Sequence, residues 1–355
     1  RLSAKMRASA LPRAPAIGAY ADAHGAKKRL LALSTIGCVA GTVARSLAQP
    51  GTVAIAIFAV LLVWPGRFLL LDYMMDDWIF GWEVVHRSRP GFEARLRAEQ
   101  AANPQRRLPP WQFAELLPLL DSANMKPANW LAMRDAIVHA VEQDGCDAVL
   151  LLHGTDTLAY SAAALSFLLL GLEIPVLLTG SMQPAGVEGS DAWPNLFGAL
   201  ALLAAGVAPG VHLYFNGRLL HGARASKWHS EAFDAFCEHQ RPRHGQRLRE
   251  LPAALHYRQP RQPVAVALQP LYPGITAGQL RGVLDSGVAA LLLECYGSGT
   301  GPADDPQMLA VLREAHARGV VLAAISQCPQ GSVQFDLYAA GSGLAACGLV
   351  SGVGM

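Results

Sequence analysis

Short apolar runs alternate along the chain with longer segments in which apolar residues recur at helical spacing. Residues 130–145 show that spacing and end at a glycine, and residues 147–152 (DAVLLL) then have the pattern of a buried strand. A polar loop follows, and the order strand, polar loop, helix repeats three times up to residue 217. This order predicts βα units, with a first strand at residues 29–36, and therefore an α/β protein with a mainly parallel sheet.

Composition divides the chain into two α/β domains. We expect a loose tail over 1–28, a larger N-terminal domain over 29–240 whose sheet is flanked by helices, a linker over 241–263 and a smaller C-terminal domain over 264–355. The linker is rich in arginine, proline and glutamine and has little apolar periodicity. The chain stops at Met355, where a further helix would be expected, so we expect a truncated second domain. The tail lacks the apolar core and cleavage site of a secretory signal.

Residues 52–64 form an uncharged apolar run between Pro50 and Pro65, which raises the question of a membrane segment. A helix needs about 20 apolar residues to span a bilayer, and this run is well short of that. The pattern therefore favours a buried element of the fold over a membrane span.

The overall composition narrows the classes of partner. The chain has 355 residues, 52% of them hydrophobic, which is ample for the cores of two domains. Its 29 basic and 27 acidic residues give a net charge of +2 without a basic block, so no nucleic-acid surface is indicated. The six cysteines form no CxxC pair and no zinc-like cluster with histidine. We therefore expect a small-molecule partner, no metal and a reducing cytoplasm.

The segment HGTDT, residues 153–157, places a polar group of side chains between an apolar strand and the next helix. Gly154 lets the backbone approach a ligand closely, Thr155 offers a hydroxyl and Asp156 a carboxylate. The N-terminal amides of the following helix can receive an anion. In open α/β sheets, ligands bind at this carboxyl edge of the strands. The alternative is a cluster of residues that only caps the helix.

Two other segments carry similar side chains. Asp121, Ser122 and Ala123 follow an apolar run and precede a helix that starts near Pro127, which is also the pattern of an ordinary capped helix start. Lys227 follows a strand and a glycine turn. A lysine held beside a carboxylate can transfer a proton to or from a threonine hydroxyl, whereas the alternative is a lone surface lysine.

These motifs occur together in a known family. HGTDT, DSAN before it and NGR with GARASK after the loop LTGSMQP stand in the order found in bacterial L-asparaginases. From Leu117 to Met355 the chain resembles that family, especially its cytoplasmic type I members. The resemblance implies hydrolysis of asparagine, and of glutamine more slowly, to the acid and ammonia without a metal or organic cofactor. It also implies a homodimer or homotetramer.

The resemblance also implies roles for individual residues. Thr155, Asp156 and Lys227 match a catalytic group in which lysine and aspartate assist a threonine or its water. Asp156 also matches the residue that receives the α-ammonium of the substrate. Binding of the α-carboxylate is implied for the segment Asp121, Ser122 and Ala123.

Two regions depart from the family pattern or extend it. Thr35 matches the nucleophile of a TGGTIG motif, but Leu33 and Ser34 stand where two glycines are expected, and side chains there would crowd a substrate. Residues 41–92 match nothing in the family, which indicates either a reading-frame disturbance or a divergent insertion. Cys328 matches an effector site of some type I enzymes, and its alternative role is that of a small buried hydrophobe.

Three functions therefore remain open from the sequence. The first is an asparaginase. The second, indicated by Leu33 and Ser34, is a catalytically impaired relative that binds asparagine. The third is the glutaminase-like subunit of a tRNA-linked amidotransferase, which shares HGTDT but normally has an additional N-terminal barrel-like domain for which the tail is too short.

Overall fold

The structure is a computed structural model, and it contains two α/β domains with separate sheets. It describes residues 57–63, 67–73, 92–104, 111–116, 120–238 and 250–352. The predicted tail, the predicted first strand and Thr35 with its neighbours Leu33 and Ser34 lie outside the described residues.

The described residues of the N-terminal domain form one sheet of seven strands in the order β3-β1-β2-β4-β5-β6-β7. Its four central strands, β2, β4, β5 and β6, run parallel, while β1, β3 and β7 pair antiparallel at the edges. The predicted α/β fold is confirmed, with antiparallel strands added on both sides of the parallel centre. The strands are β1 (Ile57–Val63), β2 (Arg67–Tyr73), β3 (Trp111–Leu116), β4 (Ala148–His153), β5 (Pro175–Thr179), β6 (Gly210–Phe215) and β7 (Arg218–His221).

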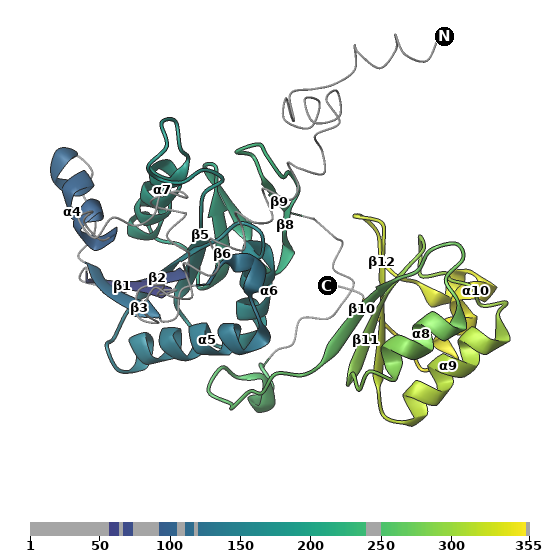
Figure 1. Cartoon of the computed structure of the whole chain (residues 1–355). Helices are drawn as coiled ribbons and strands as arrows, with labels where there is room; N and C mark the ends of the chain where they lie inside the picture. Colours follow the sequence, from purple (N-terminus) through teal and green to yellow (C-terminus); the bar gives the residue numbers. More distant parts are fainter. Residues whose placement is uncertain are drawn as a thin grey trace, which may run out of the picture. The chain divides into compact units, whose positions relative to one another are not determined.

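Helices cover both faces of the central strand β4 (Figure 1). Val149 and Leu151 pack in one core with helices α5 (Pro127–Glu142) and α6 (Leu158–Leu168). Ala148, Leu150 and Leu152, which alternate with them, belong to a second core with helices α4 (Phe92–Ala102) and α7 (Ala192–Ala205). Because every residue of β4 is buried, its sequence shows an unbroken apolar run rather than alternation.

The apolar run at residues 52–64 contributes a strand to this sheet. Its residues 57–63 form β1, which pairs antiparallel with β2 on one side and β3 on the other. Within the part of the chain that the structure describes, we find no helix with the length and apolar character needed to cross a membrane.

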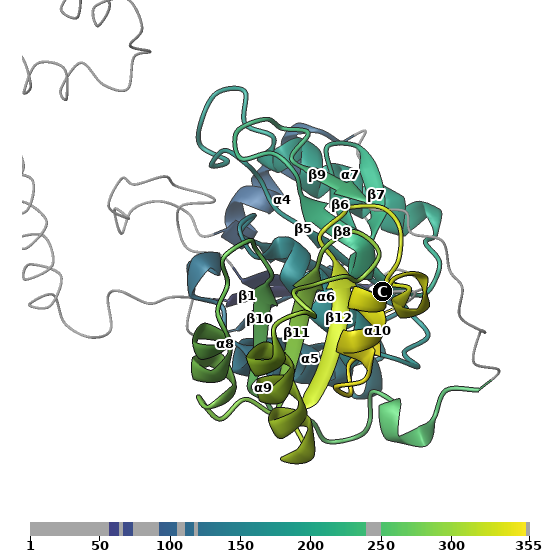
Figure 2. The same ribbon diagram turned by 90° about the vertical axis from the view of Figure 1, so that its right-hand side faces the viewer.

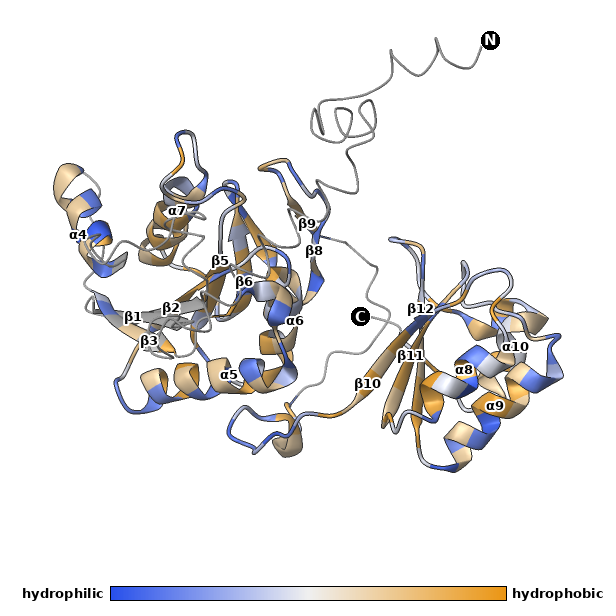
Figure 3. Cartoon of the chain, viewed as in Figure 1, coloured by the Kyte–Doolittle hydropathy of each residue, from blue (hydrophilic) through white to orange (hydrophobic). Residues whose placement is uncertain are grey.

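The C-terminal domain has a parallel sheet whose strands follow one another in sequence order, β10-β11-β12-β13. Right-handed crossovers between neighbouring parallel strands place successive helices on one face. Helices α8 and α9 share a core with β11 and β12 (Figure 2), and β10 and β11 are largely apolar in Figure 3. The elements are β10 (Val266–Pro270), α8 (Ala277–Leu284), β11 (Ala290–Cys295), α9 (Pro306–Ala317), β12 (Val321–Ser326), α10 (Ala339–Ala345) and β13 (Val350–Ser351).

Part of the predicted linker packs against the N-terminal domain. Tyr257 is 5% exposed, and its backbone N–H donates to the Leu170 carbonyl at 2.8 Å. Arg258 Nε donates to Glu142 Oε1 at 2.7 Å, and this hydrogen bond, with a second from Tyr257, lowers the pKa of Glu142. Leu251 and His256 also lie against Gly171, so a few scattered contacts, without a periodic apolar face, hold this stretch there. Residues 241–249 of the linker lie outside the described residues.

Candidate active site

The turn after β4 lies at the carboxyl edge of the parallel centre of the sheet. Strand β4 ends at His153 and α6 begins at Leu158, so the polar residues between them form the connection. Thr157 occupies the N-cap position, but its side chain makes no capping hydrogen bond. Its Oγ1 instead donates to the Ser122 carbonyl oxygen at 2.7 Å. The alternative of a simple capping cluster is therefore wrong for Thr157, which joins two segments far apart in sequence.

The segment around Ser122 touches this turn directly. Ser122 is 5% exposed and begins a short 3₁₀ turn, in which Asp121 Oδ1 accepts the backbone N–H of Ala123 at 2.9 Å. A Cβ atom placed on Gly154 would lie 2.4 Å from Ser122 Oγ and 2.6 Å from Ser122 Cβ. Gly154 therefore permits a close approach to Ser122, whereas the sequence suggested an approach to a ligand. The helix that follows this segment begins at Pro127, as predicted.

Lys227 joins the turn from a different part of the domain. It ends strand β8 (Ala225–Lys227), which pairs with β9 (Phe236–Glu238) in a small separate sheet. Its Nζ donates to Thr155 Oγ1 at 2.9 Å and to Asp156 Oδ1 at 2.7 Å. The Lys227 side chain is 21% exposed and that of Asp156 is 65% exposed. The structure thus brings together the hydroxyl, ammonium and carboxylate that the sequence suggested, and Lys227 is not a lone surface lysine.

The loop after β5 supports the same edge of the sheet. The buried Asp191 carboxylate accepts two backbone N–H groups of this loop at about 3 Å, and Asn195 Nδ2 donates to it at 3.1 Å. A Cβ atom on Gly180 would lie only 2.2 Å from the His153 carbonyl oxygen, so this loop is pressed against the turn after β4. Sequence reasoning gave no role to Asp191, although its spacing of four residues from Asn195 at a helix start was a usable signal.

A buried chain of hydrogen bonds also ends at the turn, and sequence reasoning missed it. His153 is 0% exposed, with Nδ1 at 2.7 Å from the Gly154 carbonyl oxygen and Nε2 at 2.8 Å from Ser161 Oγ. Trp130 Nε1 lies 2.8 Å from the same Ser161 Oγ. Burial lowers the pKa of His153 to about 4, although the hydrogen bond to Gly154 acts in the opposite direction. The imidazole is therefore neutral at pH 7.

Cys328 follows strand β12 in the C-terminal domain. It is exposed, and its backbone N–H donates to Ser326 Oγ at 3.0 Å. Because the side chain reaches solvent, the alternative of a small buried hydrophobe is wrong.

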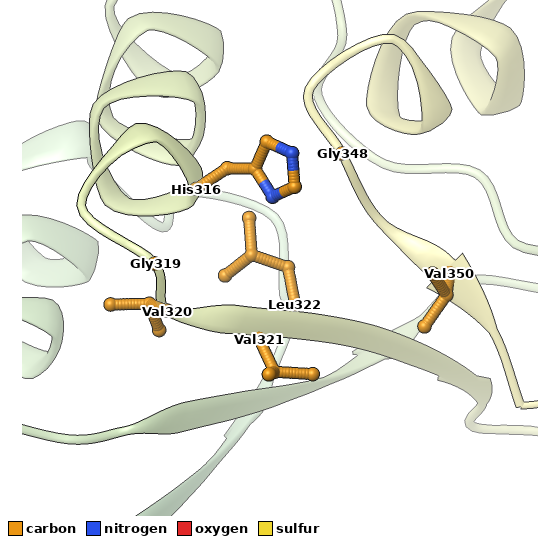
Figure 4. A pocket seen from close by; sticks show the side chains of 7 residues that line it. All are labelled: His316, Gly319, Val320, Val321, Leu322, Gly348 and Val350. Atoms are coloured by element: carbon orange, nitrogen blue, oxygen red, sulfur yellow. The ribbon is translucent and has the colours of Figure 1, made fainter.

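A small cavity in the C-terminal domain has a different character (Figure 4). Its volume is about 180 Å³, and its lining offers one titratable side chain among aliphatic groups and glycines. Binding pockets for small molecules are usually about 300 to 1,000 Å³ and hold several convergent polar groups. The cavity therefore lacks the charges that an amino-acid substrate needs. Its lining residues are His316, Gly319, Val320, Val321, Leu322, Gly348 and Val350.

The chemistry available at the turn after β4 is that of hydroxyl, ammonium and carboxylate groups. Among the residues with described positions, histidine, cysteine and acidic side chains form no group of three able to hold a metal ion. Thr155 supplies an oxygen, Lys227 can move a proton, and Asp156 balances its charge. Together with the Ser122 segment, these groups suit a small zwitterionic molecule.

Comparison with known proteins gives consistent results. Sequence models for "Asparaginase, N-terminal" and "Glutaminase/Asparaginase C-terminal domain" match residues 84–260 and 265–355. L-asparaginase 1 of Escherichia coli K12 is 36% identical over 287 residues, which cover 76% of this chain and 84% of that protein. The human 60 kDa lysophospholipase is 34% identical over 94% of this chain but only 56% of its own length.

Solved structures agree with these sequence matches. The crystal structure of L-asparaginase I from Vibrio cholerae superposes with a TM-score of 0.65 at 31% sequence identity, covering 81% of this chain and 88% of that one. The range matched by the N-terminal family model begins at residue 84, after the predicted nucleophile Thr35, and contains the whole turn around Thr155. The expectation that residues 41–92 match nothing in the family is therefore wrong for residues 84–92. The two family models, the Escherichia coli relative and the Vibrio structure together show that this chain belongs to the asparaginase family.

Proposed function

We propose that this protein hydrolyses the side-chain amide of L-asparagine to L-aspartate and ammonia. The observation that carries the proposal is the position of Lys227 Nζ, within hydrogen-bond distance of both Thr155 Oγ1 and Asp156 Oδ1. A threonine hydroxyl is a weak nucleophile at neutral pH, so its attack needs groups that carry its proton away, and Thr155 with Lys227 and Asp156 is the proposed set. The relatives from Escherichia coli and Vibrio cholerae, both named L-asparaginases, support the same substrate.

Recognition of the substrate requires groups of both polarities. The Asp156 carboxylate, 65% exposed, is accessible to an α-ammonium group. The segment Asp121, Ser122 and Ala123 adjoins the turn through the contact of Ser122 with Gly154, and it is the proposed place of the α-carboxylate. Opposite charges received at two points fix the orientation of a small amino acid, so that its side-chain amide has one position.

The proposed reaction has two stages. A threonine hydroxyl oxygen attacks the amide carbon, its proton is relayed through Thr155 and Lys227 to the amide nitrogen, and the C–N bond breaks as that nitrogen leaves as ammonia. Water then hydrolyses the ester, which releases aspartate and restores the hydroxyl. We assign the attack to Thr35, which lies outside the described residues, and proton transfer to Thr155 with Lys227 and Asp156.

The test is ammonia release from L-asparagine by the wild-type chain and by Thr155→Val, which keeps the side-chain shape and removes the hydroxyl. We expect the turnover rate of the variant to fall by about a thousandfold, because proton transfer by a positioned side chain accelerates a reaction by a factor of that order. The matched control is Thr276→Ala, because Thr276 caps α8 in the C-terminal domain and should leave turnover unchanged. A Thr155→Val variant with wild-type turnover would contradict the assignment.

The two alternatives predict different results in the same assays. If calorimetry shows that asparagine binds but no ammonia is released, the protein is an asparagine-binding relative and not an asparaginase. Ammonia release from glutamine alone, dependent on a charged tRNA, would indicate the amidotransferase subunit. We further propose slower hydrolysis of glutamine, a homodimer or homotetramer in the cytoplasm, and an effector site at Cys328. Sedimentation measures the oligomeric state. Cooperativity in the dependence of ammonia release on asparagine concentration tests the effector site.

A further inference from the structure

The hydrogen-bond chain from Trp130 to Gly154 has one direction throughout. A carbonyl oxygen only accepts and an indole N–H only donates, so Nδ1 of His153 carries the proton that it shares with Gly154. A neutral imidazole then has a lone pair on Nε2, which accepts the hydroxyl proton of Ser161. Ser161 Oγ in turn accepts from Trp130 Nε1. The Gly154 carbonyl therefore sets the tautomer of His153, and Ser161 on α6 with Trp130 on α5 complements it.

The Gly154 carbonyl, at which this chain of hydrogen bonds ends, is part of the turn after β4. The Gly154 carbonyl belongs to the same peptide group as the Thr155 backbone N–H, and a peptide group is planar. A hydrogen bond that holds the oxygen consequently fixes the direction of that N–H and the starting point of the Thr155 side chain. Gly154 has no side chain of its own with which to restrain rotation of this peptide.

Neighbouring segments hold the rest of the turn by close contact. Ser122 lies against the Gly154 Cα, and Gly180 lies against the His153 carbonyl oxygen, with no room for a Cβ atom at either glycine. These contacts limit movement of the Gly154 and Gly180 Cα atoms. They do not determine the rotation of the peptide between Gly154 and Thr155. The hydrogen bond from His153 supplies that restraint.

We propose that His153 is a positioning residue, which holds the Gly154–Thr155 peptide so that the Thr155 hydroxyl stays beside Lys227, and that Ser161 and Trp130 support it in the tautomer this requires. The inference rests on the proposed function, because positioning serves the proton transfer at Thr155. The hydroxyl lies 2.9 Å from Lys227 Nζ. A displacement of about 1 Å in such a group can lower the rate by about a hundredfold.

A matched pair of amide variants separates positioning from general support of the fold. In His153→Asn the amide nitrogen is attached to Cγ, as Nδ1 is, and it can still donate to the Gly154 carbonyl. In His153→Gln the amide lies one carbon further out, where it can meet Ser161 but no longer donates to Gly154. We expect kcat to fall by about ten- to a hundredfold in the Gln variant with little change in KM, and by less than about threefold in the Asn variant.

Equal loss of kcat in both variants, or a change confined to thermal stability, would overturn the proposal. A second measurement, of the His153 tautomer, requires neither of the two variants and no catalytic activity. The ¹⁵N chemical shifts of His153 in the wild-type protein should show the proton on Nδ1, and a proton on Nε2 alone would overturn the proposal.

The amide resonance of Thr155 separates this inference from the proposed function. It should shift in His153→Gln and stay near its wild-type position in His153→Asn, even if asparagine is not hydrolysed. A wild-type chain without turnover therefore contradicts the proposed function and leaves this test of positioning intact. The same Thr155 shift in both variants would contradict the positioning role alone.

Discussion

Two ion pairs of equal length, one in each domain, have very different surroundings. Lys227 and Asp156 approach to 2.7 Å in the N-terminal domain, as do Arg281 and Glu314 between helices α8 and α9 of the C-terminal domain. The Arg281 and Glu314 side chains are 45% and 50% exposed, and the hydrogen bond from Arg281 lowers the pKa of Glu314. Asp156 is 65% exposed, but Lys227 is only 21% exposed and also bonds a hydroxyl, Thr155 Oγ1.

The comparison shows which features make an ion pair a candidate for chemistry. A short distance between charges is common on protein surfaces and contributes little by itself. At the turn after β4 the same distance is combined with a third group that can be the reactant and with a place at the carboxyl edge of a parallel sheet. The pair between α8 and α9 has the charges alone.

The largest expected effect comes from removing the cation of each pair. Lys227→Met should lower turnover of asparagine by about a thousandfold, because it removes the group that moves the threonine proton. Arg281→Met should leave turnover within about twofold of wild type, since its pair is exposed and screened. Steady-state ammonia release measures both. A Lys227→Met variant that keeps its rate, or an Arg281→Met variant that loses it, would remove the distinction between the two regions.

The two domains also differ in how the hydrogen-bonded residue at the end of a strand responds to pH. At the end of β4, His153 is buried, and its pKa falls from the ordinary value of 6.5 to about 4. At the end of β12, the uncharged hydroxyl of Ser326 donates to the Gly297 carbonyl at 2.5 Å. Only the first of these two groups titrates. Between pH 6.5 and 4 the unfolded chain binds a proton at this histidine that the folded chain does not.

Stability should therefore fall with pH through His153. Its contribution is complete above pH 6.5 and is lost as pH falls toward 4, with a change in the free energy of unfolding of about 3 kcal/mol. Urea denaturation of wild type and His153→Asn measures this: the difference between them should shrink by that amount over the window. In the control, Ser326→Ala, the stability curve should run parallel to that of wild type. If the stability of His153→Asn ran parallel to that of wild type across this pH range, burial of His153 would not be coupled to proton binding.

The same two regions show how far sequence reasoning reaches. Strand β4 and the start of α5 at Pro127 were predictable, because a strand covered on both faces is a continuous apolar run and a proline marks a first helical turn. Short strands carry no such signal. Strand β8 has three residues, so the sequence placed Lys227 after a turn but did not place it in a separate antiparallel pair.

Contacts between distant segments were the least predictable part of the candidate site. The glycine in HGTDT is visible in the sequence, yet the atom that excludes its Cβ belongs to Ser122, which lies on another segment. The partners of the His153 hydrogen-bond chain likewise include Ser161 and Trp130, from two different helices. Sequence patterns report burial along one element, whereas these contacts depend on how several elements meet.

The smallest expected effects compare a crowded glycine in the turn after β4 with an uncrowded glycine inside α8. In Gly154→Ala the new Cβ would meet Ser122 Oγ at 2.4 Å, so the Ser122 segment must move, which should destabilise the fold by about 1 to 3 kcal/mol and lower turnover. In Gly282→Ala, inside α8, the Cβ meets nothing within 4 Å, and the helix should gain up to about 1 kcal/mol. Chemical denaturation measures both changes, and the opposite signs are the essential result. A Gly154→Ala variant as stable and active as wild type would mean that Ser122 can withdraw without affecting Thr155, so that contact between the two segments would no longer support their assignment to one site.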